Sequence, residues 1–139
     1  MAKISFKMPE EFIKRIEALS DNREAVITKC LEAAGEIVEK EVKNSLYDVL
    51  SPEERNGELI NSLGLTPAMI DKNGVYNVKI GFSGMRGDGK KNALVGAILE
   101  YGTKDGRQPP RPYMKPAKNR SQKAAIEAMI KTFDEEVKK

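Results

Sequence analysis

Apolar and polar residues follow a strand-like period at the start of the chain and a helical period soon after it. Residues 3–8 alternate with a period of two, which is typical of a short, half-buried strand that Pro9 ends. Residues 10–19 and about 21–50 place apolar side chains at helical spacing, which predicts a short amphipathic helix and then a long one. At about 1.5 Å per residue the long helix would span about 45 Å, enough to be the scaffold of the fold.

Strand-forming residues follow the helical half. A short helical turn over about 58–63 leads into residues 65–82, which are rich in β-formers. Asn73 and Gly74 divide this segment and favour the type I′ turn of a two-residue β-hairpin. Pro67 cannot donate to a strand ladder, so it confines the first strand of the hairpin to a sheet edge or to a late start.

Prolines shape the stretch from Leu99 to Ala117, which holds four of the seven prolines in the chain. Each proline fixes φ and lacks an N–H, so most of this stretch is expected to be extended, with Tyr113 and Met114 as apolar anchors. Apolar residues at helical spacing then predict a C-terminal helix over about 117–138 that packs against the sheet or the long helix.

The predicted fold class is α+β, with a long N-terminal amphipathic helix and a C-terminal helix packed on a small antiparallel sheet. The length of 139 residues favours a single domain over 1–139. The helical half would cover about 1–63, and the hairpin, a Gly-rich loop, the Pro-rich segment and the C-terminal helix would cover about 64–139. The one cysteine, Cys30, excludes an intramolecular disulfide and falls within the apolar stripe of the long helix, so it is expected in the core.

The sequence contains no long apolar segment. No apolar run approaches the roughly 20 residues of a membrane span, and the N-terminus lacks a signal-peptide pattern. We therefore expect a protein that is cytosolic at synthesis and has no membrane partner.

The sequence offers little for catalysis. It contains no histidine, the side chain that most readily transfers protons near neutral pH and most often binds transition metals. Glu100 lies beside an apolar run, but no activated nucleophile or evidently paired second carboxylate accompanies it as a general base would require. A structural hydrogen bond or ion pair, with Arg111 as its partner, is the expected role of Glu100. We predict no enzyme, no catalytic residue, no metal site and no cofactor.

Charge is unevenly distributed along the chain. Residues 1–60 carry 9 Lys/Arg and 13 Asp/Glu, a balance of −4, whereas residues 61–139 carry 15 and 8, a balance of +7. Such asymmetry suits head-to-tail assembly or contact with polyanions, although solvated helix faces and basic loops would also produce it.

A Gly-rich basic loop spans residues 83–92 and has two interpretations. It is either a plain connection or a flexible finger whose cations contact nucleic-acid phosphates without regard to sequence. Gly84 to Lys90 has the spacing of a phosphate-binding loop, but Lys91 stands where Ser or Thr would be needed for the metal.

Four short motifs occur in a distinctive order: Asn56-Gly57-Glu58-Leu59-Ile60-Asn61-Ser62, Glu100-Tyr101-Gly102-Thr103, Pro110-Arg111-Pro112-Tyr113 and Pro116-Ala117. In this order the chain resembles the tail-completion and head–tail joining proteins (minor tail components) of lambdoid-type long-tailed bacteriophages and prophages. The resemblance covers nearly the whole chain. The second and third motifs are fairly specific, whereas the helical half is generic and Asn56 replaces the usual Thr.

The resemblance implies a structural virion protein. Members form a ring, commonly a hexamer, at the head-proximal end of the tail tube, stop its growth and present a surface to the head connector, and DNA passes through the lumen. The implied partners are other copies, the tail tube protein, the head connector and transiently the genomic DNA, with assembly in the host cytoplasm. The expected joining surface or oligomer interface comprises Glu100, Tyr101, Gly102, Thr103, Arg111, Pro112 and Tyr113, and the candidate lumen or DNA contacts are Arg86, Lys90 and Lys91.

Two other functions fit the same residues. A small nucleic-acid-binding module would use the basic second half, and it would bind DNA with a steep salt dependence as an isolated monomer or dimer. Pro109 to Pro112 also fits a Pro-x-x-P ligand of a peptide-recognition domain, a weaker match.

Overall fold

The computed structural model describes residues 3–7, 10–17, 23–55 and 57–137. Pro9, the predicted end of the first strand, and Asn56, part of the first motif, lie outside the described residues. The elements in chain order are β1 (Ile4–Lys7), α1 (Glu10–Glu17), α2 (Arg23–Val49), α3 (Glu58–Ser62), β2 (Leu63–Leu65), β3 (Met69–Ile70), β4 (Tyr76–Phe82), α4 (Asn92–Tyr101) and α5 (Met114–Val137). This order confirms the predicted α+β fold and both long helices.

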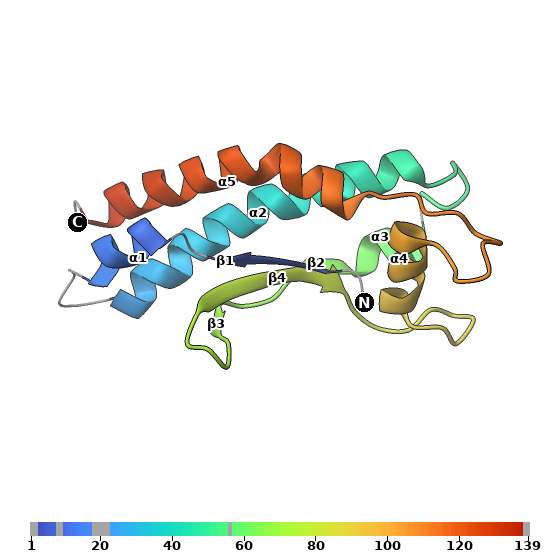
Figure 1. Ribbon diagram of the computed structural model, residues 1–139, viewed down its shortest axis with the longest axis horizontal. Helices are drawn as coiled ribbons and strands as arrows, with labels where there is room; N and C mark the ends of the chain where they lie inside the picture. Colours follow the sequence, from blue (N-terminus) through green and yellow to red (C-terminus); the bar gives the residue numbers. More distant parts are fainter. Residues whose placement is uncertain (1–2, 8–9, 18–22, 56, 138–139) are drawn as a thin grey trace.

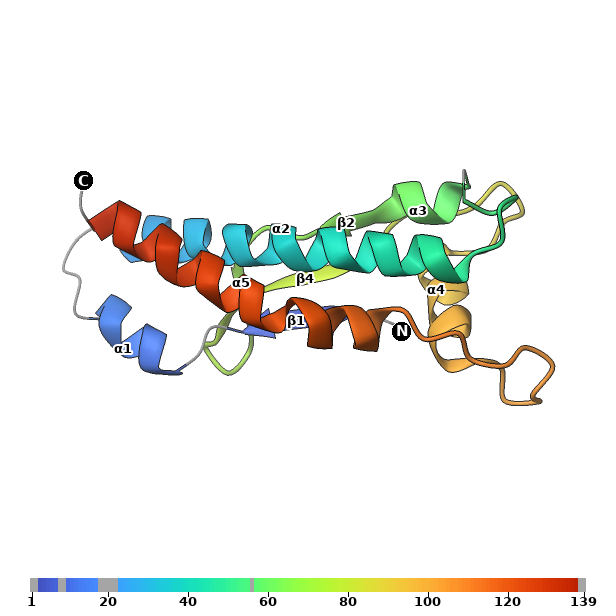
Figure 2. The same ribbon diagram turned by 90° about the horizontal axis from the view of Figure 1, so that it is seen from above.

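The long helices form two layers over one face of the sheet. α2 lies across the sheet and α5 packs along α2, so the C-terminal helix covers the long helix rather than the strands (Figure 1 and Figure 2). Gly35 lets the layers approach closely, because a Cβ there would lie 2.8 Å from a methyl carbon of Leu65. The buried apolar residues that α2 supplies to this core are Val26, Ile27, Cys30, Leu31, Ala34, Val38, Val42 and Leu46.

β4 is the central strand of an antiparallel sheet. β1 pairs with one edge of β4, and β2 and β3 pair in turn with the other edge. The gap between β2 and β3 is bridged by Thr66, whose N–H donates to the Lys79 carbonyl oxygen at 2.8 Å and whose hydroxyl accepts the Lys79 N–H at 2.9 Å. The first strand of the hairpin is thus interrupted next to Pro67, as its missing N–H predicts.

The hairpin turn differs from the predicted type I′ turn. The Gly74 N–H donates to the Asp71 carbonyl oxygen at 3.0 Å, so Asn73 and Gly74 end a turn that begins at Asp71 instead of forming its two central positions. Gly74 has a φ of 79°, which fits a turn followed by a left-handed bulge residue. The cause is the Asp71 carboxylate, which accepts the N–H groups of Asn73 and Val75 at 2.8 and 3.0 Å.

Two helix assignments also go beyond the prediction. The apolar residues before Gly102 form helix α4, which periodicity alone left unassigned. α5 begins at Met114, three residues before the expected start, and it includes Pro116 in its first turn. A missing N–H has no consequence there, since the first amides of a helix have no intrahelical acceptor. Within the described ranges, no helix has the combined length and apolarity needed to cross a membrane.

Cys30 is fully buried, as predicted, and its burial raises the pKa of the thiol to about 11, with the charge of Glu136 adding to the effect. Because the thiolate is the reactive form, we expect the folded protein to react with an aromatic disulfide reagent far more slowly than the urea-unfolded chain. Absorbance of the released thiol at mildly alkaline pH measures both rates. Equal rates would contradict the burial of Cys30.

Candidate functional site

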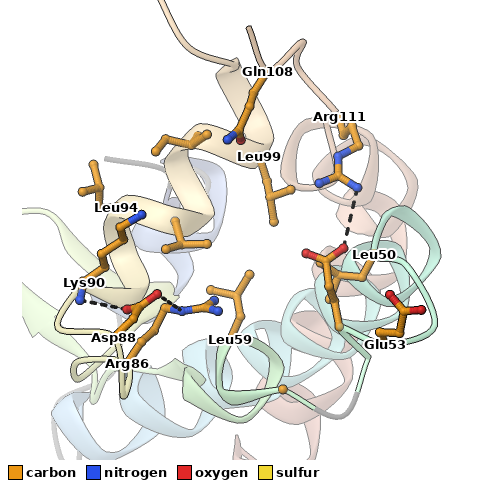
Figure 3. A pocket seen from close by; sticks show the side chains of 14 residues that line it. Leu50, Glu53, Leu59, Arg86, Asp88, Lys90, Leu94, Leu99, Gln108 and Arg111 are labelled. Carbon is orange, nitrogen blue, oxygen red and sulfur yellow. Dashed lines mark hydrogen bonds and ion pairs between the residues drawn. The ribbon is translucent and has the colours of Figure 1, made fainter.

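Three connections meet at one end of the molecule. They are the turn after α2, the loop between β4 and α4, and the loop between α4 and α5 (Figure 1). Between them lies a cavity of about 450 Å³, which we call the end groove (Figure 3). Its apolar residues are Leu50, Leu59, Leu94, Val95, Ile98 and Leu99, and its charged residues are Glu53, Glu54, Arg86, Asp88, Lys90 and Arg111.

Glu100 joins α4 to the start of α5. Its carboxylate is only 5% exposed and accepts the backbone N–H groups of Tyr113, Met114 and Lys115 at 2.7, 3.1 and 3.0 Å. These amides begin α5 and have no acceptor within the helix, so a carboxylate from another helix caps them and complements the helix dipole. The structural hydrogen-bonding role predicted for Glu100 is confirmed.

Arg111 is not the partner of Glu100, so that part of the prediction is wrong. Its Nη1 donates to the Val49 carbonyl oxygen at 2.9 Å and lies 4.0 Å from a carboxylate oxygen of Glu54. The guanidinium therefore satisfies a carbonyl at the C-terminal end of α2, where intrahelical donors are lacking. The expected pair fails because the α5 amides occupy the buried carboxylate of Glu100.

Tyr113 anchors the Pro-rich segment in the core. The side chain is fully buried, its hydroxyl donates to the Gly96 carbonyl oxygen at 2.8 Å, and its ring meets that of Phe82 edge to face at 6.2 Å. A Cβ on Gly96 would lie 2.4 Å from the Phe82 ring, so this glycine allows both rings to reach α4. Burial, with the charge of Glu100 adding, raises the pKa of Tyr113 well above its usual range, so the hydroxyl stays a neutral donor.

Gly102 and Thr103 close the loop that follows α4. Gly102 has a φ of 76°, and a Cβ there would lie 2.8 Å from the Gln108 carbonyl oxygen. The Thr103 N–H donates to that same oxygen at 3.0 Å, and the Thr103 hydroxyl accepts the Gln108 N–H at 3.1 Å. The same hydroxyl donates to Asp105 at 2.7 Å. The loop therefore has a defined shape set by backbone contacts that only glycine permits.

The structure divides the predicted joining surface into two groups. Five of its residues build and hold the end of the molecule through hydrogen bonds or close backbone packing: Glu100, Gly102, Thr103, Arg111 and Tyr113. Tyr101 and Pro112 instead face solvent, and Tyr101 is 68% exposed. The first group can shape a contact surface, and the second can contribute side chains to it.

The Gly-rich loop is folded back on itself. The Arg86 N–H donates to the Lys90 carbonyl oxygen at 2.7 Å, and the Gly87 N–H donates to the Glu58 carboxylate at 2.9 Å. The guanidinium of Arg86 lies in the end groove, 3.6 Å from Asp88, whereas Lys90 and Lys91 are exposed (Figure 3). The three predicted DNA contacts are close in space, but Arg86 is engaged inward.

The sequence did not predict that Glu54 or the apolar side of α4 belongs to the site. Ser51 donates both its N–H and its hydroxyl to Glu54, at 3.0 and 2.8 Å. These bonds, with Arg111 and Arg86 adding, hold the pKa of Glu54 below its usual range. Glu100 is the only charged residue from Asn92 to Tyr101, a composition that marks an apolar segment but does not distinguish a helix from a buried strand.

The residues at this end of the molecule form hydrogen bonds, ion pairs and an apolar-lined cavity. Among the residues that the structure describes, no group of three or more His, Cys, Asp or Glu side chains could hold a metal ion. Several ionisable groups in and around the groove have partners: Arg86 lies beside Asp88, Arg111 lies beside Glu54, and Glu100 caps the start of α5. Comparison of the chain with protein-family models, with curated proteins and with solved structures gave no match.

Proposed function

We propose that this chain is a structural virion protein of a tailed bacteriophage or prophage. It forms a ring at the head-proximal end of the tail, completes the tail and joins it to the head connector. The observation that carries the proposal is the bond of 2.7 Å between the Glu100 carboxylate and the Tyr113 amide. This bond joins the motif that begins at Glu100 to the motif that ends at Tyr113, and these are the two most specific motifs of the resemblance. The bond lies at the end of the molecule where the loops meet.

The construction of this end suits docking between proteins. The end groove is lined by both apolar and charged side chains, and contact surfaces between proteins combine such groups. The loops around it are held by their own hydrogen bonds, so they lose little conformational freedom when a partner binds. The paired helices α2 and α5 hold this end as a rigid support (Figure 2).

The proposal assigns no catalytic step to the chain. Glu100 accepts three backbone N–H groups and is almost fully buried, and Tyr113 is fully buried with its hydroxyl bonded to Gly96. Neither group can reach a substrate as the protein is folded. The partners that the proposal names are other copies of the chain, the tail tube protein, the head connector and passing genomic DNA, in the virion.

Deletion of the gene from the phage or prophage that encodes it tests the proposal. We expect DNA-filled heads and separate tails in electron micrographs of the induced culture, and joined particles again when the wild-type chain is supplied from a plasmid. A chain with both exposed α4 residues changed, Leu94→Asp/Tyr101→Asp, should not restore joining, whereas Met69→Asp/Ile70→Asp on the hairpin is the matched control. Joined, infectious particles in the deletion strain would refute the proposal.

A small nucleic-acid-binding module is the alternative, and the exposure of Lys90 and Lys91 favours it. Native mass by light scattering, over a concentration series with and without short duplex DNA, separates the two functions. A ring-sized oligomer, or a monomer indifferent to DNA, supports the joining protein. A monomer or dimer that binds duplex tightly at low salt and releases it at high salt supports the module.

A further inference from the structure

The outward side of α4 is apolar and bordered by cations. The only charged residue of the helix, Glu100, is turned into the fold and bound to the α5 amides. Leu94 is 47% exposed and Tyr101 is 68% exposed, and their separation of seven residues places them on one side of the helix. We call this surface the α4 patch; it comprises Lys90, Lys91, Leu94, Ala97, Ile98 and Tyr101.

The last turns of α5 carry an apolar surface bordered by acids. Ile130 is 38% exposed and Val137 is 49% exposed, again seven residues apart on one helix. Ile130 lies in a shallow depression of about 440 Å³ whose other lining residues are charged. We call this surface the α5 patch; it comprises Glu127, Ile130, Lys131, Asp134, Glu135 and Val137.

The two patches complement each other in spacing and in charge. In each, two exposed apolar side chains are separated by seven residues, which is about 10.5 Å along a helix. The lysines of the α4 patch carry +2. The three acids of the α5 patch against its one lysine give −2, and Arg15 of α1, 3.4 Å from Asp134, reduces this balance to −1. We infer that the α4 patch of one copy packs on the α5 patch of the next copy, with Leu94 beside Ile130 and Tyr101 beside Val137, the register that brings Lys91 level with Glu127.

The positions of the patches make this contact head to tail. α4 lies at one end of the molecule and the last turns of α5 lie at the other, as both views show (Figure 1 and Figure 2). The inference rests on the proposed function, because a ring needs two unlike patches on every subunit. A two-fold pair through either patch is disfavoured, since it would place four lysines, or two net-acidic surfaces, against each other.

Disulfide trapping in the full chain tests the contact directly. The variant Leu94→Cys/Ile130→Cys should give, under mild oxidation, a ladder of covalent oligomers on a non-reducing gel, because each copy would link to two neighbours. Leu94→Cys alone and Met69→Cys/Ile130→Cys are the controls and should give no ladder. The native Cys30 is buried and does not take part. A ladder no stronger than in the controls overturns the inference.

Charge reversal provides a second, independent test. Lys90→Glu/Lys91→Glu and Glu127→Lys/Glu135→Lys should each weaken self-association about tenfold in sedimentation experiments, and an equimolar mixture should restore it. If the mixture is as weak as its components, the inferred pairing is wrong. If charge reversal has no effect but head–tail joining still requires the gene, only this contact is refuted. If the ladder forms but joining does not require the gene, only the proposed function is refuted.

Discussion

Replacing Glu100 by alanine is expected to lower the free energy of unfolding by about 3–5 kcal/mol. The substitution leaves three amides at the start of α5 without an acceptor, and each buried donor left unpaired costs about 1–3 kcal/mol. The amides of Tyr113 and Met114 are buried, so water cannot fully replace the carboxylate. Urea unfolding followed by circular dichroism measures the loss, provided that the slope with urea is unchanged.

Two further variants separate this cap from a general effect of charge. Glu100→Gln keeps the shape and one acceptor oxygen, so it should lose about half as much stability as Glu100→Ala. Glu53→Ala removes an exposed carboxylate from the same end of the molecule and should change stability by less than about 0.5 kcal/mol. A loss below about 1 kcal/mol for Glu100→Ala would contradict the capping role.

The Glu100 cap also shows what sequence reasoning can and cannot reach. The isolation of Glu100 in an apolar run, without catalytic companions, was enough to predict a structural hydrogen bond. The identity of its partners was not predictable, because helix α5 brings its first amides to the carboxylate only through the tertiary fold. Arg111 finds its acceptor at Val49, 62 residues earlier in the chain, for the same reason.

Local patterns predicted the main elements but not their details. The period of the apolar residues identified α2 and β4, because both elements bury one regular face. It could not assign α4, since a short apolar run suits a buried strand as well as a helix. The turn at Asn73 and Gly74 was assigned wrongly because the Asp71 side chain binds two amides and selects a different turn.

The second large effect is expected at Tyr113. Tyr113→Ala should lower the free energy of unfolding by about 3–5 kcal/mol, because it removes a fully buried ring that packs against Phe82 and leaves a cavity. The Pro-rich segment would lose its anchor in the core at the same time, while the Glu100 carboxylate and the bond from the Arg111 N–H to the Leu99 carbonyl oxygen would still hold it to α4. Urea unfolding measures the loss of stability.

Tyr113→Phe isolates the hydroxyl from the ring. It keeps the packing but leaves the Gly96 carbonyl oxygen without the donor that lies 2.8 Å away, so the expected loss is about 1–2 kcal/mol. If phenylalanine costs as much as alanine, the hydroxyl rather than the ring anchors the segment. If alanine costs less than about 1 kcal/mol, Tyr113 is not an anchor, and the Pro-rich segment must be held to α4 mainly by the Glu100 carboxylate.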